Sequence, residues 1–263
     1  NWNASGNFPN GNVSFNDSYL TGSAYTTVDR TSNAYSYIYS IYFQNTSSAQ
    51  NAYTINGSSQ IMLGGPKVQT SAVSSGSLTD VINANFQQGG TAEVFDMGSN
   101  HHLILNGDII GSSGAISKNG TGNLKVTGNR SSTGGWTLNA GTLQITNANA
   151  ITSGGVTSTG TAKLWLDASG GNMTVEGPIT LKGGGGGHLT IGSGNVTTNG
   201  TITLTGSIDV RGSGSDTHYV EGGITSANNS SYGANNKTII NSIVSLGSGQ
   251  LNFTSTESQI NVA

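Results

Sequence analysis

Short triplets with apolar residues at both ends recur along this chain, and their spacing constrains the fold more than any other feature. In an extended strand the two end residues of a triplet face one side and the middle residue faces the other. β-Branched residues are frequent in the triplets, and Gly, Asn and Ser separate them, as turns require. The triplets are 103–105, 124–126, 136–138, 143–145, 164–166, 173–175, 179–181, 189–191, 202–204, 208–210, 251–253 and 260–262.

The strand-like units fall into two interleaved series that share one long period. Members of the first series start 19 to 25 residues apart, and members of the second start 20 to 23 residues apart. Such a period indicates a solenoid in which each coil carries two or three short strands, stacked in parallel about 4.8 Å apart. The first series starts at residues 103, 124, 143, 164, 189 and 208, and the second at 116, 136, 156, 179, 202 and 224.

A sandwich of sequential hairpins also gives short alternating strands, but it does not need a constant long period in two series. We therefore favour an all-β parallel β-helix, or β-solenoid, with roughly 20–25 residues per coil. Only 33% of the residues are hydrophobic, and a narrow core that neighbouring coils bury together is consistent with so small a fraction. The 41 glycines among 263 residues then belong to the corners between strands.

Charge is scarce in this chain, which has 9 Lys and Arg, 12 Asp and Glu, and a net charge of −3. Nucleic-acid binding requires clustered Lys and Arg, so we expect no nucleic-acid partner. No apolar run approaches the ~18 residues of a membrane-spanning helix. The absence of Cys excludes disulfides and thiolate metal sites. The first residue, Asn1, is consistent with a processed secreted protein or with a trimmed chain.

The first hundred residues differ in sequence pattern from the rest of the chain, so we expect an N-terminal cap or first coils over 1–100 and repeating coils over 101–263. Alternation in the aromatic segment 35–43 places three tyrosines on one face, with Ile38 and Tyr42 on the other. This strand is either buried in a first coil or an edge that pairs with another subunit. Residues expected to mediate self-association are Tyr35, Tyr37, Tyr39, Ile41, Phe43, Leu251, Phe253, Ile260 and Val262.

Few residues suggest catalysis or metal binding. Hydrolysis of a glycosidic bond needs two positioned carboxyl groups, whereas the acids here are scattered. If Ile208 and Val210 face inward, Asp209 and Arg211 share an outer strand face; this is either an active site or an ordinary solvated pair. The charged residues that gather there are Asp209, Arg211, Asp216, His218 and Glu221.

Two further motifs were weighed as ligand sites. Adjacent strand residues face opposite sides, so His101 and His102 do not easily bind one metal ion together with Asp96. The glycine run 183–187 is followed by His188 and Leu189 rather than by the Gly-Lys-Ser/Thr of a phosphate-binding loop. We therefore expect no catalytic residues, no metal ligands and no cofactor.

One stretch of about thirty residues carries a family resemblance. Residues 114–146 resemble the autotransporter-associated β-strand repeat, also called the passenger-associated transport repeat. Residues 39–63 are similar to the N-terminal region of large secreted bacterial proteins that bear such repeats. The resemblance implies a right-handed parallel β-helix that is secreted or displayed on a bacterial surface. The matching positions are Lys118, Gly120, Gly122, Leu124, Val126, Gly128, Asn129, Thr133, Gly134, Gly135, Asn139, Gly141 and Leu143.

Two functions from different classes remain. The first is a non-catalytic extracellular structural β-solenoid that self-associates end to end into a fibre or acts as an adhesin-like passenger. Its expected partners are further copies of itself, surface polysaccharide, or a host or cell surface. The second is a carbohydrate-active β-helix enzyme, a polysaccharide lyase or hydrolase, for which the Asp209 segment is the candidate site.

Overall fold

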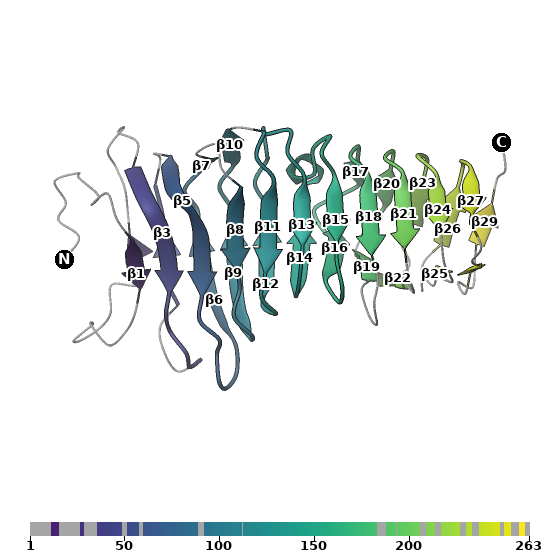
Figure 1. Ribbon diagram of the computed structural model, residues 1–263. Helices are drawn as coiled ribbons and strands as arrows, with labels where there is room; N and C mark the ends of the chain where they lie inside the picture. The colour runs from purple at the N-terminus through teal and green to yellow at the C-terminus, as the bar shows by residue number, and fades with distance from the viewer. Residues whose placement is uncertain are drawn as a thin grey trace.

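The computed structural model is an elongated stack of parallel strands (Figure 1), which confirms the expected parallel β-helix. Successive rungs follow one another along a single axis, so strands far apart in number lie far apart in the stack (Figure 1). The structure describes residues 12–15, 27–28, 36–48, 52–57, 60–88, 92–111, 113–182, 188–192, 194–205, 209–213, 217–226, 230–232, 237–247, 250–253 and 258–260.

The first sheet has 13 strands, and its main path takes one strand from each coil. Two shorter strands, β7 (Phe86–Gln88) and β10 (Ile109–Gly111), branch from this path through β5. The strands of the main path, in order, are β1 (Val13–Phe15), β3 (Ser36–Phe43), β5 (Ile61–Thr70), β8 (Glu93–Asp96), β11 (Ile116–Asn119), β13 (Trp136–Leu138), β15 (Val156–Ser158), β18 (Ile179–Lys182), β21 (Ile202–Thr205), β24 (Ile224–Ser226) and β27 (Val244–Leu246).

The second sheet has 11 strands and runs alongside the first through the whole stack. Both sheets continue across residue 100 without interruption, through the pairings of β8 with β11 and of β6 with β9. The strands of the second sheet are β2 (Thr27–Val28), β4 (Thr54–Ile55), β6 (Leu78–Ile82), β9 (His101–Leu105), β12 (Asn123–Val126), β14 (Thr142–Ile145), β16 (Lys163–Asp167), β19 (His188–Gly192), β22 (Asp209–Ser213), β25 (Ser230–Tyr232) and β28 (Leu251–Phe253).

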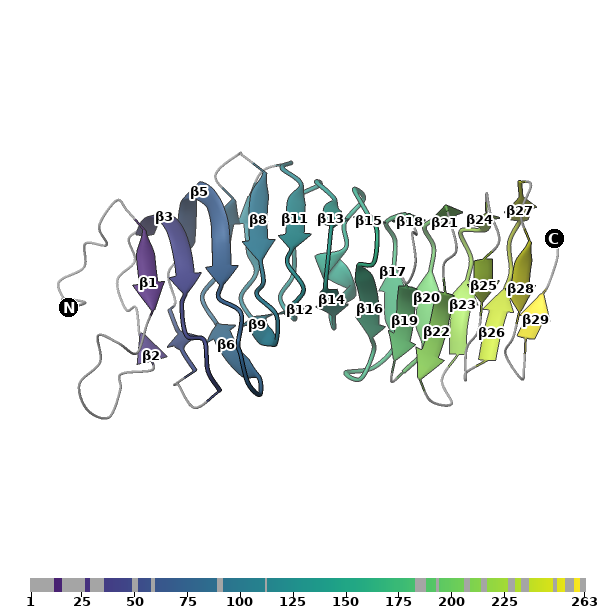
Figure 2. The same ribbon diagram turned by 60° about the horizontal axis from the view of Figure 1, so that its bottom comes forward.

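A third sheet of 5 strands closes only the later coils (Figure 2). In earlier coils this side carries β7, β10, a parallel bridge between Ile109 and Arg130, and the 3₁₀ helix η2 (Ala148–Ala150). The expectation of two or three strands per coil therefore holds, with the change from one arrangement to the other at β17. The strands are β17 (Met173–Val175), β20 (Val196–Thr198), β23 (Thr217–Val220), β26 (Lys237–Ile240) and β29 (Ser258–Ile260).

Strand register confirms the second of the two predicted series in full. Each of its members pairs with the next at the same position of the first sheet, and all of them are almost completely buried. Their side chains form one continuous inward ladder, because parallel pairing brings equivalent positions of adjacent coils together. The members are Ile116, Trp136, Val156, Ile179, Ile202 and Ile224.

The first series is confirmed except for its last member. Leu103, Leu124, Leu143, Leu164 and Leu189 pair in order and are completely buried. Leu189 then pairs with Val210, so the predicted alignment of Ile208 with Leu189 is wrong by two positions. Ile208 itself lies outside the described residues. The turns between coils vary in length, so spacing along the chain does not determine register alone.

The aromatic segment does not follow a simple alternation, which corrects our expectation for residues 35–43. The pairing of β3 with β5 has a register shift between Ile38 and Ser40. Ser40 and Ile41 are both buried, so the buried positions change from Ile38 and Ser40 to Ile41 and Phe43. A β-bulge of this kind reorients the side chains that follow it. Tyr42 is consequently half-buried and does not share the orientation of Ile38.

Candidate functional site

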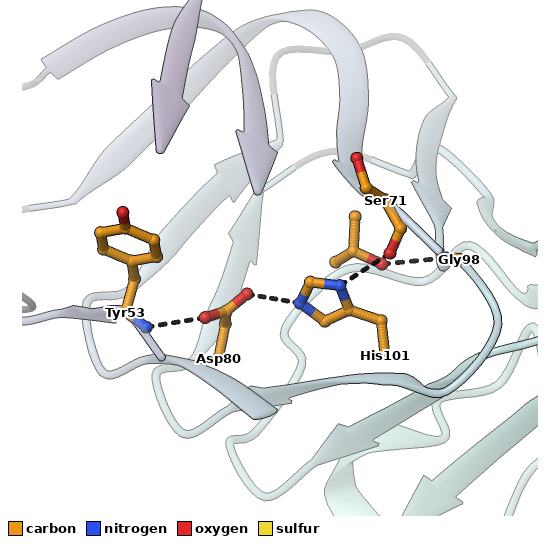
Figure 3. A network of polar contacts seen from close by, with 6 residues as sticks. Tyr53, Ser71, Asp80, Gly98 and His101 are labelled. Carbon is orange, nitrogen blue, oxygen red and sulfur yellow. Dashed lines mark hydrogen bonds and ion pairs between the residues drawn. The ribbon is translucent and has the colours of Figure 1, made fainter. Parts of the chain in front are cut away.

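A pair of ionisable residues, Asp80 and His101, is buried on adjacent strands of the second sheet (Figure 3). His101 Nε2 lies 2.6 Å from Asp80 Oδ2, and both side chains are 0% exposed. His101 Nδ1 lies 2.8 Å from the Ser71 carbonyl, and Asp80 Oδ1 accepts from the Tyr53 N–H at 2.7 Å. Because a carbonyl only accepts, Nδ1 carries a proton, and a second proton lies between Nε2 and Asp80. This network joins three coils and leaves no opening to solvent at either side chain.

Lys118 is a second ionisable residue at a core position, since it pairs with Phe95 and Leu138 and is 0% exposed. Its Nζ donates to the carbonyls of Asn119 at 2.9 Å, Gly120 at 2.7 Å and Ala140 at 3.0 Å. Burial lowers the pKa of Lys118 to about 8, and the charge of Asp96 partly offsets that shift. All three donors are used, so the amine serves to stabilise two consecutive turns.

Arg130 is buried on the third side of the earlier coils. Its Nε donates to Ser132 Oγ at 2.7 Å and its Nη2 to the Gly114 carbonyl at 3.0 Å, and the guanidinium lies 5.4 Å from the centre of the Trp136 ring. Burial lowers the pKa of Arg130 to about 10. Trp136 donates from Nε1 to the Ala150 carbonyl at 2.8 Å. These contacts replace the missing third strand with polar and aromatic packing.

His218 faces the core of the later coils, between Val196 and Thr238 of the third sheet. Burial lowers its pKa to about 3, so the imidazole is neutral at physiological pH. Its Nε2 lies 3.3 Å from Thr198 Oγ1. The expected cluster around Asp209 is therefore not a single surface site, because His218 is inside while Arg211 and Glu221 are exposed. Asp216 and the side chain of Asp209 lie outside the described residues.

Asparagine and threonine side chains form ladders along the outer corners. Where strands of the second sheet end, Asn83 Nδ2 bonds to Asn56, Asn106 Nδ2 to Asn83 at 2.8 Å, and Thr127 Oγ1 to Asn106 at 2.8 Å. Where strands of the third sheet end, amides alternate with acids: Asn199 donates to Glu176 and Asn241 donates to Glu221. A ladder joins each coil to its neighbour outside the core, so much of the Asn content has a structural role.

The described residues form a polar groove of about 340 Å³. Three of its residues, Thr127, Thr146 and Ala168, directly follow strands β12, β14 and β16. The segment after Ala168 leads into β17, where the third sheet begins. A volume of this order fits a small ligand or part of a polymer. The full lining is Thr127, Thr146, Asn147, Ala148, Asn149, Ala168, Gly170, Gly171, Asn172 and Met173.

The same three strands present an outer face beside this groove. Lys125, Gln144 and Trp165 pair in order, so their side chains form one outward row. All three are half-buried. Lys163 is exposed two residues before Trp165 on the same face. Asp167, on the other side of Trp165, is 7% exposed and accepts from Gln144 Nε2 at 2.7 Å and from the Ser169 N–H at 3.1 Å.

The residues expected to mediate self-association have different environments. Ile41 and Phe43 are 0% and 1% exposed, so their side chains belong to the core and are not available to another subunit. Tyr39 is 52% exposed, and Leu251 is half-buried in the last strand of the second sheet. Tyr35, Val262 and the side chains of Tyr37, Phe253 and Ile260 lie outside the described residues.

The histidine pair behaves as strand geometry predicts. His101 is buried while His102 is half-exposed on the opposite face. Burial, with a smaller contribution from His101, lowers the pKa of His102. Within the described ranges no group of three or more His, Asp or Glu side chains is arranged to hold a metal ion. The described part of the chain likewise has no helix long and apolar enough to cross a membrane. The glycine run 183–187 lies outside the described residues.

Comparison with known proteins gives no match: no family model, no curated protein and no solved structure matches this chain. The class of protein is therefore defined by the fold alone, a parallel β-helix, and its function must be argued from the geometry above.

Sequence reasoning missed Asp80, the burial of Lys118 and the groove. Asp80 lies one coil before Leu103 in the leucine ladder. Extending that ladder toward the N-terminus would therefore have predicted a buried aspartate at a core position. The groove had no comparable signal, because its residues come from three coils.

Proposed function

We propose that this protein is a non-catalytic extracellular structural β-solenoid, either an adhesin-like passenger or a unit that associates into a fibre. The main support for the proposal is that several of its few ionisable residues are buried and serve to stabilise the fold. Asp80, His101, Lys118, Arg130 and His218 are all buried in the framework, where general acid–base chemistry on an external substrate has no access to them. The outer corners carry hydrogen-bonded amide and hydroxyl ladders that suit a durable scaffold.

Self-association is the part of the proposal that electron microscopy tests most directly. Parallel stacking leaves unpaired N–H and C=O groups at the edge of a terminal strand, and such an edge accepts a further strand. Purified protein at high concentration is expected to show end-to-end assemblies. Compact monomers alone would contradict fibre formation, while an adhesive role would stand.

The carbohydrate-active enzyme is the alternative, and Arg211 is the observation that favours it. Val210 is buried and Arg211 is exposed, so the outer face of β22 carries Arg211. Incubation with a panel of polysaccharides, followed by chromatography of the products, decides between the two. Cleavage by wild type that disappears in the Asp209→Ala variant would support the carbohydrate-active enzyme. If every polymer stays intact, the result supports the non-catalytic scaffold.

A further inference from the structure

The groove after β12, β14 and β16 and the adjoining outer face form one continuous feature, because both arise from the same three strands. Lys125, Gln144 and Trp165 lie on the strands themselves. Thr127, Thr146 and Ala168 follow at the strand ends and line the groove. Adjacent parallel strands are about 4.8 Å apart, so the row from Lys125 to Trp165 extends about 10 Å along the stack.

Neutral hydrogen-bonding groups dominate the groove. Asn147 is held by donation from Nδ2 to the Thr127 carbonyl at 3.2 Å and to Asn129 Oδ1 at 3.1 Å, and its Oδ1 accepts from the Asn149 N–H at 3.0 Å. These amides are therefore preorganised, which reduces the entropy lost on binding. The Asn147 amide and the hydroxyls of Thr127 and Thr146 already donate within the protein, so their oxygens remain as acceptors for the hydroxyl groups of a sugar. The groove alone suits a polyhydroxylated ligand.

Trp165 supplies an apolar surface beside the groove. Its Nε1 is covered and makes no hydrogen bond with any residue that the structure describes, yet the residue is only half-buried. The exposed part of the indole is consequently ring carbon. An aromatic carbon surface packs against the C–H face of a pyranose ring, and an indole offers more area for this than any other side chain.

Positive charge around Trp165 further restricts the class of ligand that this surface can bind. Lys125 and Lys163 reach solvent, and neither ammonium group has a hydrogen-bond or ion-pair partner in the described part of the chain. The one described acid of this part of the face, Asp167, is covered and already accepts two hydrogen bonds. Two accessible cations and no accessible described acid therefore flank the indole. The complementary ligand carries anionic groups along its length.

We infer that the groove and the outer face of β12, β14 and β16 bind a polysaccharide that carries carboxylate groups, with its sugar hydroxyls on the Asn and Thr side chains, one ring on Trp165 and its carboxylates on Lys125 and Lys163. Two lysines are too few for a phosphate backbone, which requires a larger basic surface. The polar lining is also unsuited to an apolar peptide. This inference rests on the adhesive form of the proposed function and names its partner.

Affinity electrophoresis of the full chain in gels containing polygalacturonate tests the inference. Wild type is expected to be retarded at low salt and released at high salt, because exposed ion pairs are screened. Lys125→Gln and Lys163→Gln are each expected to weaken binding about fivefold, and Trp165→Thr by a similar factor. Lys182→Gln makes the same change of charge at an exposed position on β18 of the first sheet and is expected to leave binding unchanged.

Several results would overturn the inference. They are no retardation of wild type, an equal loss of binding in Lys182→Gln, or equal retention by neutral dextran or by a DNA duplex. The two lysine variants change only ammonium groups that reach solvent, so they test the inference even if Trp165→Thr fails to fold. Polymer recovered from the gels is also analysed for cleavage. Cleavage of the polymer would refute the non-catalytic function but not the proposed binding site. If the polymer stays intact and the protein does not bind it, only the proposed binding site is refuted.

Discussion

Asp80 and His101 lie on adjacent strands of the second sheet, 2.6 Å apart from Oδ2 to Nε2, and the stack encloses both side chains completely. Asp80 pairs in register with Leu103, and Leu78 pairs with His101. Asp80 thus occupies a position at which later coils carry leucine, and His101 follows a leucine of the preceding coil. A buried pair of this kind stabilises a fold only while both partners and their outer hydrogen bonds are present.

Removing one partner of this pair should be far more harmful than removing both. Asp80→Leu alone leaves His101 without its acceptor and is expected to lower the free energy of unfolding by about 3–5 kcal/mol. The double variant Asp80→Leu with His101→Leu extends the leucine ladder and is expected to recover at least half of that loss. Urea denaturation followed by circular dichroism measures both. Equal losses in the single and double variants would contradict this view, and Glu176→Gln on the exposed corner is a control.

His218 should make the later coils sensitive to acid. Its folded pKa of about 3 lies below the unfolded value of 6.5, so at intermediate pH the unfolded chain binds a proton that the folded chain does not. The stability from this residue is present above pH 6.5 and is lost as pH falls toward 3, at about 1.4 kcal/mol per pH unit.

The variant His218→Val, which matches Val196 in the same ladder, isolates this dependence. Urea midpoints of wild type and variant are compared at pH 7 and pH 5. The free energy of unfolding of the variant relative to wild type is expected to be about 2 kcal/mol higher at pH 5 than at pH 7. Parallel pH dependences would show that His218 is protonated in the folded protein or that its coil unfolds separately.

Lys118 should resist conservative replacement. Lys118→Met retains much of the side-chain volume but leaves the carbonyls of Gly120 and Ala140 without this donor, while the Asn119 carbonyl still accepts from the Met97 N–H at 3.0 Å. Each buried acceptor without a partner costs about 1 kcal/mol or more, so a loss of about 2 kcal/mol is expected. The matched control is Lys125→Met, on the outer face of the next strand. Similar thermal midpoints for the two variants would contradict a structural role for the buried amine.

The effect of a Gly→Ala substitution on stability should depend on the space around the glycine. A Cβ at Gly122 would collide with the backbone carbonyls of Gly98 and His101, whereas a Cβ at Gly170 would meet nothing within 4 Å. Gly122→Ala is therefore expected to destabilise the protein by several kcal/mol, comparable to the largest single-site effects. Gly170→Ala is expected to change stability by less than about 0.5 kcal/mol. Differential scanning calorimetry compares them, and equal midpoints would show that the coils separate readily at Gly122.

The periodic positions were the predictable part of this structure. Ile116, Trp136 and Val156 are in register because each lies in a regular strand, and the intervening turns have constant length. The prediction failed at Ile208, where the turns differ in length and Val210 takes the position opposite Leu189. It failed also in the aromatic segment, where a bulge after Ile38 brings Ile41 and Phe43 into the core.

The candidate site was predictable only in part. Lys125 and Trp165 are 40 residues apart in the chain, with one strand of the sheet between them. They are the middle residues of two triplets of the first series, so alternation and the shared period place them on one outer face. The groove at the ends of their strands was not predictable, because it depends on where three separate turns run. The sequence did show correctly that Val210 faces inward and Arg211 outward, since alternation within a strand is a local property.

The amino-acid sequence by itself determined the architecture, an all-β solenoid with two long ladders of inward residues. It did so because alternation within a strand and the spacing of turns are short-range features, and stacking follows once they repeat. Only the tertiary structure decided which polar residues belong to the core. Whether Asp80, Lys118 or His218 is buried depends on the coils above and below it, which lie some twenty residues away, and on the register that turns of unequal length allow.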